Sequence, residues 1–296
     1  MAAETRGESA GWVCLDGELM PPHEARVSPF DFGFLYGDGL FETLRTYGGV
    51  PFRLRAHLDR LRSGVEALGI PGVPPLSALE EWTGRTLERA ALPEAYLRIT
   101  VTRGRGQRGL DPSGCEAATV FIAALPLRPQ AVSFETGLQA VFLWPRHSGE
   151  QPPPTVKSTS YQRGVLARSR LAREGAGEGF FLDEHGHVTE GSVSNVFAVH
   201  AGGLHTPPAH ACLPGITRQE VLAIARELGL PSHEAPLPKE RLAEAEELFV
   251  TSSLMELMPI VRLQGRPVGD GRPGPVTRNL HRLYQARTRA AGERLA

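Results

Sequence analysis

Apolar positions recur along the chain at the spacings of helices and strands. In residues 56–68 the side chains Leu58, Leu61 and Val65 repeat at intervals of three and four, the spacing of one helix face, and Gly69 follows as a helix stop. Four further segments are predicted to be helical, at residues 76–92, 161–174, 217–228 and 276–290.

Segments rich in β-branched and aromatic residues, bounded by turn residues, predict strands. Residues 11–20 predict two short strands around an Asp-Gly turn, and residues 39–54 predict a hairpin with Gly48 and Gly49 at its tip. Further strands are predicted in residues 95–104, 118–127, 179–190, 194–207 and 247–253.

The short segment LRPQ, residues 127–130, is the candidate linker between two domains. Strands and two helices precede it in residues 1–126, and the remaining predicted elements follow in residues 131–296. Because hairpins and helices are mixed on both sides, the pattern predicts an α+β chain of two domains.

Composition and charge exclude several classes of protein. The chain has 296 residues, 41% of them hydrophobic, and its formal net charge of −1 indicates neither a nucleic-acid partner nor a membrane surface. The polar start, residues 1–11, lacks the apolar core of a signal peptide, and no apolar run is long enough to span a bilayer.

The cysteines and histidines predict neither a disulfide nor a metal site. Cys14, Cys115 and Cys212 are odd in number and far apart, and the histidines adopt no paired metal-binding spacing. These features fit a reducing compartment, so a cytoplasmic location is expected.

One lysine in the middle of the chain stands out against this composition. Among 32 Lys plus Arg residues, only Lys157 and Lys239 are lysines. A guanidinium stays protonated in proteins, whereas a desolvated ammonium can lose its proton and attack a carbonyl group. Lys157 is therefore either an ordinary surface cation or an amine kept for covalent chemistry.

The segment LPGITRQEVL, residues 213–222, could bind an anion. Gly215 allows a tight turn, and a helix that opens at Ile216 or Thr217 would present free backbone N–H groups and the positive end of its dipole. Since most helix starts bind only water, this segment alone does not identify a phosphate site.

Three other segments carry polar side chains, each with two interpretations. Glu190 precedes a turn of small residues, which is either an ordinary hairpin corner or a place for a carboxylate that orients a ring nitrogen. Residues 250–256 end a strand in hydroxyl groups that could cap a helix or hold phosphate oxygens. Arg60, beside His57 on a predicted helix, belongs to a solvated face or to an anion clamp.

Taken in order, these segments resemble the fold-type IV pyridoxal-phosphate enzymes, also called class IV aminotransferases. The matching segments are SPFDFGFLYGDGLFETLR, HLDRL, KSTSY, TEGSVSN, PGITR, LFVTSS with MELMPI, and GPVTR. The similarity extends from about Trp12 to Tyr284, and the ordered set is more specific than any single motif. The resemblance implies a smaller N-terminal α/β domain, a larger C-terminal pseudo-barrel domain that binds pyridoxal phosphate, and a homodimer.

The resemblance also implies a role for each matched residue. Lys157 would bind pyridoxal phosphate covalently and then move protons at the substrate Cα, and Glu190 would keep the pyridine nitrogen protonated. Tyr161 would face the phenolic oxygen of the cofactor. The other residues expected to contact the cofactor, several of them at its phosphate, are Arg60, Ser194, Asn195, Ile216, Thr217, Ser252 and Ser253.

The substrate side favours a lyase over an aminotransferase. RGRGQRG, residues 103–109, matches a run common in 4-amino-4-deoxychorismate lyases, and residues 41–45 read FETLR where branched-chain aminotransferases usually read FEGIR. D-Amino-acid aminotransferases typically carry a histidine where this chain has Leu110. The residues expected to contact substrate are Tyr36, Phe41, Arg108 and Met255.

The first prediction is therefore a 4-amino-4-deoxychorismate lyase that gives 4-aminobenzoate and pyruvate. The alternative is an aminotransferase that acts on branched-chain L-amino acids or D-amino acids with 2-oxoglutarate or another keto acid. A catalytically idle relative is a third possibility, against which the presence of both Lys157 and Glu190 argues.

Overall fold

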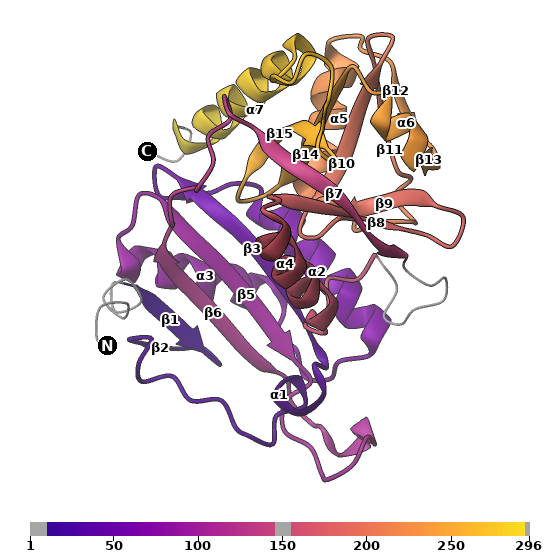
Figure 1. The fold of residues 1–296 in the computed structure, drawn as a ribbon. Helices are drawn as coiled ribbons and strands as arrows, with labels where there is room; N and C mark the ends of the chain where they lie inside the picture. The colour runs from indigo at the N-terminus through magenta and orange to yellow at the C-terminus, as the bar shows by residue number, and fades with distance from the viewer. Residues whose placement is uncertain (1–10, 146–154, 294–296) are drawn as a thin grey trace. The chain divides into compact units, whose positions relative to one another are not determined.

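The computed structural model describes residues 11–145 and 155–293, and the chain divides into two compact units (Figure 1). Unit 1 comprises residues 1–129, 156–161 and 288–296, and unit 2 comprises residues 130–155 and 162–287. Residues 1–10, on which the expected absence of a signal peptide depends, lie outside the described residues.

Unit 1 contains an antiparallel sheet of six strands in the order β2-β1-β6-β5-β3-β4. The strands are β1 (Trp12–Leu15), β2 (Glu18–Met20), β3 (Gly39–Tyr47), β4 (Val50–Pro51), β5 (Ala95–Thr102) and β6 (Thr119–Pro126). The helices are α1 (Phe32–Tyr36), α2 (Leu54–Leu68) and α3 (Leu76–Ala90), with a 3-10 turn at Pro112–Gly114.

The core of unit 1 lies between the sheet and helices α2 and α3. Leu40 and Leu44 of β3 pack there with Leu58 and Leu61 of α2, and all four side chains are buried. Because side chains alternate along a strand, Glu42 lies on the same face as these two leucines, whereas Phe41 points to the opposite face. One strand thus supplies a buried carboxylate to α2 and an aromatic ring to the other face.

Unit 2 contains a sheet of ten strands in the order β12-β11-β10-β14-β15-β7-β8-β9-β13, with β16 beside β15. The strands are β7 (Leu138–Pro145), β8 (Glu178–Leu182), β9 (His187–Gly191), β10 (Asn195–His200), β11 (Gly203–Thr206), β12 (Ser232–Glu234), β13 (Leu237–Pro238), β14 (Glu247–Ser252), β15 (Glu256–Leu263) and β16 (Arg266–Pro267). The helices are α4 (Gln162–Glu174), α5 (Ile216–Glu227), α6 (Lys239–Ala243) and α7 (Pro275–Glu293), although residues 288–293 of α7 are counted with unit 1.

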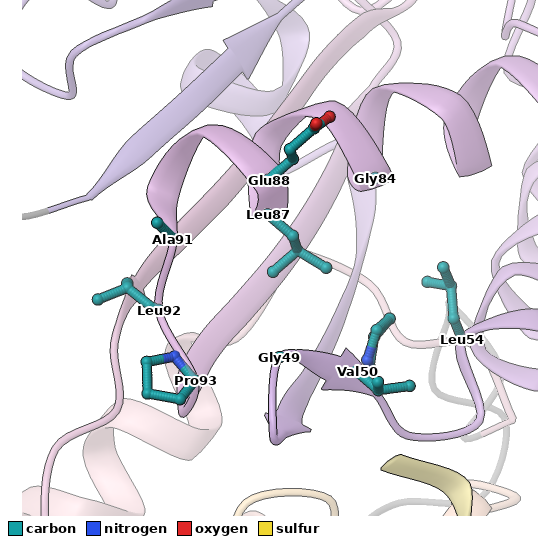
Figure 2. A pocket seen from close by; sticks show the side chains of 10 residues that line it. Gly49, Val50, Leu54, Gly84, Leu87, Glu88, Ala91, Leu92 and Pro93 are labelled. Carbon is teal, nitrogen blue, oxygen red and sulfur yellow. The ribbon is translucent and has the colours of Figure 1, made fainter. Parts of the chain in front are cut away.

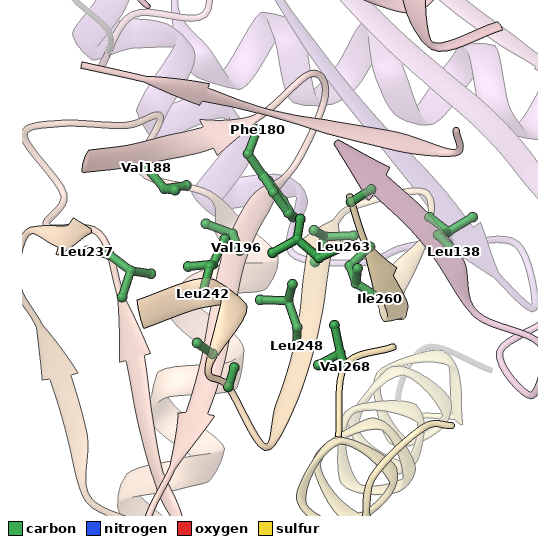
Figure 3. Packing of buried hydrophobic residues seen from close by; sticks show 14 of the residues in the cluster. Leu138, Phe180, Val188, Val196, Leu237, Leu242, Leu248, Ile260, Leu263 and Val268 are labelled. Atoms are coloured by element: carbon green, nitrogen blue, oxygen red, sulfur yellow. The ribbon is translucent and has the colours of Figure 1, made fainter. Parts of the chain in front are cut away.

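The main core of unit 2 gathers side chains from most of these strands (Figure 3). Phe180 of β8, Val196 of β10 and Ile260 of β15 are buried in it with Leu242 of α6. On the opposite face of β10 and β14 the rings of Phe197 and Phe249 stack, with centroids 5.0 Å apart. The sheet is therefore apolar on both faces, as its short, nearly continuous apolar runs require.

Most predicted elements agree with the structure to within a few residues. The helix predicted at 217–228 is α5, Ile216–Glu227, and the helix predicted at 56–68 begins two residues earlier, at Leu54. The largest omission is β15, which contains Pro259 in a sheet interior position opposite Phe249. Proline usually argues against a central strand, and the pattern analysis offered no strand there.

The structure differs from the predicted domain division at Lys157. The prediction assigned residues 131–296 to one domain, but residues 156–161 belong to unit 1. Ser158 forms a β-bridge with Leu40, so this segment is held by backbone contacts to β3. This bridge pairs residues that are far apart in the sequence. Hydrophobic periodicity describes only local structure, so it could not predict the pairing.

Candidate active site

Lys157 is fixed to unit 1 by its own backbone. The amide of Phe41 donates to the carbonyl of Lys157 over 3.0 Å, and the amide of Thr159 donates to the carbonyl of Gly39 over 2.8 Å. These two bonds flank the bridge between Leu40 and Ser158. Lys157 therefore lies at a defined position beside the start of β3 rather than on a loop of its own.

The hydroxyl groups that follow Lys157 explain the KSTS run. Thr159 Oγ1 and Ser160 Oγ both donate to the carbonyl of Gly37, over 2.7 and 3.0 Å. Gly37 has a φ of 68°, and a Cβ atom there would lie 2.9 Å from Ser160 Oγ. Position 37 therefore requires glycine for two reasons: the left-handed backbone conformation after α1 and the close approach of the segment that contains Lys157.

The amine of Lys157 lies among aromatic rings and one arginine. Its Nζ is 4.5 Å from the ring centroid of Phe41 and 5.5 Å from that of Tyr161, and these two rings meet edge to face at 5.2 Å. The guanidinium of Arg98 lies 3.9 Å from the centroid of the same Phe41 ring. Arg98 was not predicted from the sequence. It lies on the less buried face of β5 and pairs with Thr43 of β3.

Arg60 forms a buried ion pair with Glu42. Arg60 Nε donates to Glu42 Oε1 over 2.8 Å, Arg60 Nη2 lies 2.7 Å from Oε2, and His57 Nδ1 lies 2.7 Å from the same Oε2. Burial alone would raise the pKa of Glu42, but the charge and hydrogen bonds of Arg60, with those of His57, outweigh it and lower this pKa to about 2. Burial lowers the pKa of His57, although Glu42 opposes the change. The phosphate-binding candidate is thus an arginine oriented by a fixed carboxylate.

In unit 2, Glu190 and Asn195 hold the loop that leads into α5. Glu190 Oε2 accepts from the amide of Leu213 over 3.0 Å, and Asn195 Nδ2 donates to the carbonyl of Leu213 over 2.8 Å. Burial, and next the charge of Glu190, raise the pKa of Cys212 to about 12, so this thiol is inert at neutral pH. A Cβ atom on Gly215 would lie 1.9 Å from Asn195 Oδ1, so only glycine fits before the helix.

The N-terminus of α5 has the properties expected of an anion site. The helix begins at Ile216 after an N-cap glycine, Gly215, which has no side chain to cap it. The N–H groups of its first turn, including those of Ile216 and Thr217, have no intrahelical acceptor and lie at the positive end of the dipole. The sequence prediction of a helix opening here matches the structure.

The turn after β14 contains two residues predicted to contact the phosphate. Ser252 Oγ accepts from the amide of Met255 over 3.1 Å, which closes the turn that contains Ser253. Thr251 precedes the turn and pairs with Asn195 across the sheet. Its Oγ1 is buried and has no hydrogen-bond partner among the residues that the structure describes.

Ser194, also predicted to contact the cofactor, makes an internal bond instead. Its hydroxyl donates to Glu178 Oε2 over 2.7 Å. Met255 is half-buried against the main core of unit 2, and Tyr36 is exposed on α1 with its ring edge to face against Phe32 at 5.0 Å. None of these contacts assigns a substrate role.

The RGRGQRG segment contains two buried residues, Arg103 and Gly104, and several exposed ones. Arg103 Nε lies 2.5 Å from Asp38 Oδ2, and its two Nη atoms donate to the carbonyls of Leu68 and Gly69 over 2.9 and 2.8 Å. Arg103 therefore satisfies the last carbonyls of α2, which is a structural task. Arg108, the candidate for a substrate carboxylate, is exposed on the loop after β5.

A pocket of about 560 Å³ lies in unit 1 away from these residues (Figure 2). Its lining comes from the β3–β4 hairpin tip, the start of α2 and the end of α3, and Glu88 is its only charged side chain. In residues 11–145 and 155–293 no group of three His, Cys, Asp or Glu side chains could hold a metal ion. Over the same ranges no helix has the length and apolar composition to cross a membrane.

The residues present fit pyridoxal phosphate. Unit 1 offers an amine at Lys157 for covalent attachment and a cation at Arg60 for the phosphate. Unit 2 offers the uncapped start of α5 for the phosphate, a carboxylate at Glu190 for the pyridine nitrogen and an unsatisfied buried hydroxyl at Thr251. Buried polar atoms normally have partners, so Thr251 Oγ1 leaves one hydrogen-bonding position open to a bound group or to water.

Comparisons with known proteins agree with these observations. The model of the family described as amino-transferase class IV matches residues 39–263. The chain is 37% identical over 275 residues to the putative branched-chain-amino-acid aminotransferase of Methanocaldococcus jannaschii, with 92% of this chain and 95% of that protein covered.

Solved structures give the same result. The branched-chain amino acid aminotransferase of Escherichia coli superposes with a TM-score of 0.89 at 31% identity, over 93% of this chain and 94% of that one. The T.th. branched-chain amino acid aminotransferase complexed with N-(5'-phosphopyridoxyl)-L-glutamate gives 0.89 at 28% identity, over 95% of each chain. The predicted fold class is confirmed. The chain therefore belongs to the class IV aminotransferase family, the fold-type IV enzymes that use pyridoxal phosphate, as its seven matching segments predicted.

Proposed function

We propose that the protein is an aminotransferase that moves the amino group of branched-chain L-amino acids to 2-oxoglutarate. The observation that carries the proposal is the nearly full-length similarity to proteins named branched-chain-amino-acid aminotransferases. The lyase predicted first from the sequence has support only from the family, which it shares with the aminotransferases.

The sequence features that favoured the lyase carry less weight in the folded chain. The first arginine of RGRGQRG, Arg103, binds Asp38 and the end of α2, so its side chain is used for stability. Thr43, which replaces the glycine usual in FEGIR, pairs with Arg98 across β3 and β5. Neither residue supports recognition of a lyase substrate.

Ligands found in related structures support a dicarboxylate acceptor and an aliphatic side chain. The T.th. enzyme was solved with N-(5'-phosphopyridoxyl)-L-glutamate and with 4-methylvaleric acid, and the Thermoproteus uzoniensis enzyme with norvaline. In this chain an apolar side chain could lie against the rings of Phe41 and Tyr161, beside the amine of Lys157. Arg98, on the same Phe41 ring, is our candidate for the second carboxylate of glutamate and 2-oxoglutarate.

Each group in this proposal has a separate chemical task. Bound pyridoxal phosphate supplies an electron sink for charge that develops at the substrate Cα. Lys157 moves the proton at that carbon, and the rings of Phe41 and Tyr161 lie 4.5 and 5.5 Å from its amine. In unit 2, Glu190 would hold a proton on the ring nitrogen and the start of α5 would bind the phosphate; in unit 1, Arg60 is a separate candidate for the phosphate.

The test is a comparison of three reactions with the purified protein. L-Leucine, L-isoleucine and L-valine should each be converted when 2-oxoglutarate is present and remain unchanged when it is omitted. D-Alanine with the same acceptor tests the D-amino-acid alternative. Formation of 4-aminobenzoate from 4-amino-4-deoxychorismate without any keto acid, and no conversion of L-leucine, would instead support the lyase.

A homodimer is part of the proposal. The segment from Val27 to Tyr36 exposes several large apolar side chains of unit 1, with exposed fractions of 54% for Phe30 and 74% for Phe34. A contiguous apolar segment of this kind is typical of a protein interface, and a second copy is the partner that the sequence resemblance implies. Light scattering should give twice the mass of 32.1 kDa, and Phe34→Asp should shift the measured mass toward that of the monomer.

We also expect a cytoplasmic location and small-molecule substrates.

A further inference from the structure

Glu178, at the start of β8, is a buried carboxylate in which each oxygen accepts hydrogen bonds. Oε1 accepts from the amides of Gly179 and Ser192 over 2.7 and 2.9 Å and from Ser192 Oγ over 2.5 Å. Oε2 accepts from Ser194 Oγ over 2.7 Å. The side chain is 1% exposed. A carboxylate is costly to bury, and four donors offset much of that cost.

Three of these four donors belong to the turn between β9 and β10. The turn is closed by the amide of Gly191, which donates to the carbonyl of Ser194 over 2.7 Å. A Cβ atom on Gly191 would lie 2.2 Å from Ser194 Oγ and 3.0 Å from the carboxyl carbon of Glu178. The turn is therefore packed directly on the carboxylate, with no space for another atom.

The residues on either side of this turn both bind Leu213. Glu190 precedes the turn and accepts from the amide of Leu213, and Asn195 follows it and donates to the carbonyl of Leu213. Leu213 lies two residues before Gly215, the N-cap of α5. A continuous set of hydrogen bonds thus runs from Glu178 through the turn to the start of α5.

We propose that Glu178 is a positioning residue for the cofactor site. By holding the Gly191–Ser194 turn, Glu178 fixes the distance between Glu190 and Asn195. It thereby fixes the position of the Glu190 carboxylate relative to the N-terminus of α5. Glu178 itself touches neither cofactor nor substrate in this assignment. The inference rests on the proposed cofactor roles of Glu190 and α5, and it adds a residue outside the seven matching segments.

The decisive variant is Ser194→Ala, which removes only the bond to Oε2. Ser169→Ala is the matched control, because Ser169 Oγ donates to the carbonyl of Val165 on the exposed side of α4. Loss of one hydrogen bond to a charged group in S194A should weaken binding of pyridoxal phosphate, measured without substrate, by about three- to thirtyfold. S169A should bind it as the parent does.

Hydrogen exchange of the Leu213 amide gives a readout that needs no cofactor. In the apo protein, exchange at Leu213 should accelerate by about threefold or more in S194A, while exchange at Val250 in the core of β14 stays unchanged. A role limited to general stability would instead accelerate both amides together. The bound cofactor's absorbance maximum and its pH dependence should also move, since the partner of the ring nitrogen is displaced.

Gly191→Ala and Glu178→Gln extend the test. G191A forces the turn away from an intact carboxylate and should exceed the effect of S194A at Leu213. E178Q keeps an oxygen that accepts from Ser192, and its amide N–H can donate a hydrogen bond to Ser194 Oγ. It should therefore retain more of the parent's cofactor affinity than Glu178→Ala does.

Unchanged Leu213 exchange and cofactor affinity in folded S194A and G191A would overturn the proposal. The two proposals can fail separately. If the parent protein binds no pyridoxal phosphate but S194A still changes Leu213 exchange, the proposed function is overturned, while the link from Glu178 to Leu213 stands.

Discussion

Glu42 holds Arg60 through two guanidinium nitrogens, with Nε 2.8 Å from one carboxylate oxygen and Nη2 2.7 Å from the other. The carboxylate is 1% exposed and the arginine side chain 11% exposed. Such a pair contributes little net stability when intact, because desolvation offsets the attraction, but loss of one partner leaves a buried charge. The orientation of Arg60 therefore depends on a residue of the sheet, not on its own helix.

Glu42→Gln should lower the free energy of unfolding by about 3 kcal/mol, because the amide leaves the Arg60 charge without its counterion. Urea denaturation of the apo protein measures this change. The matched control is Glu80→Gln, which breaks the exposed pair between Arg55 and Glu80. Exposed pairs contribute about 0–1 kcal/mol, so E80Q should change stability by no more than that. Equal effects of the two substitutions would contradict the prediction.

Stability should increase with pH across the acidic range. The pKa of Glu42 is lowered from 4.5 to about 2, so its contribution is fully present above pH 4.5 and is lost as the pH falls toward 2. The pKa of His57 is lowered from 6.5, mainly by burial, so its neutral form also favours the folded state and that contribution declines below pH 6.5. The free energy of unfolding of the parent should fall between about pH 5 and about pH 3, and E42Q should show a smaller slope there. A parent and an E42Q variant with parallel profiles would rule out Glu42 as the cause.

Lys157→Arg should abolish covalent attachment of the cofactor while it preserves charge. A guanidinium stays protonated and cannot attack the carbonyl carbon, so turnover should fall by at least about a hundredfold. Lys239→Arg is the control, because Lys239 is the only other lysine and is exposed at the start of α6. Borohydride reduction followed by peptide mapping should find the cofactor mass at residue 157 in the parent and in K239R. Cofactor mass at residue 239, or turnover retained in K157R, would remove Lys157 from its assigned role.

The sequence predicted local features well and long-range pairings poorly. The Gly215 turn and the helix at Ile216 follow from turn chemistry and apolar spacing, so the sequence alone was sufficient to predict both. Glu42 was not predicted, because its neighbours in the sequence do not reveal that β3 faces α2. Arg98 was missed for the same reason, since its closeness to Lys157 arises from the register of β5 on β3 and the return of residues 156–161 to that strand.

Substitution of two arginines of the RGRGQRG segment should change stability by very different amounts. Arg103→Ala leaves Asp38 and the final carbonyls of α2 without a donor, so it should lower the free energy of unfolding by about 3 kcal/mol. Arg108→Ala removes an exposed side chain and should change stability by less than about 0.5 kcal/mol. Thermal denaturation distinguishes the two. A raised KM in R108A with unchanged stability would restore the substrate role that the sequence suggested.

Arg98→Ala should separate the two substrates of the proposed aminotransferase. Arg98 lies 3.9 Å from the Phe41 ring that the Lys157 amine also approaches, so it can meet the distal carboxylate of 2-oxoglutarate but has no partner on a leucine side chain. Loss of a charged hydrogen bond should raise the KM for 2-oxoglutarate by about ten- to a hundredfold and leave the KM for L-leucine within about threefold. Arg89→Ala is the control, since Arg89, in the last turn of α3, lies 3.9 Å from the Trp12 ring in the same kind of contact. If R98A raised both KM values equally, or neither, the carboxylate of the acceptor would have to bind elsewhere, and Arg98 would be left with a packing role on Phe41.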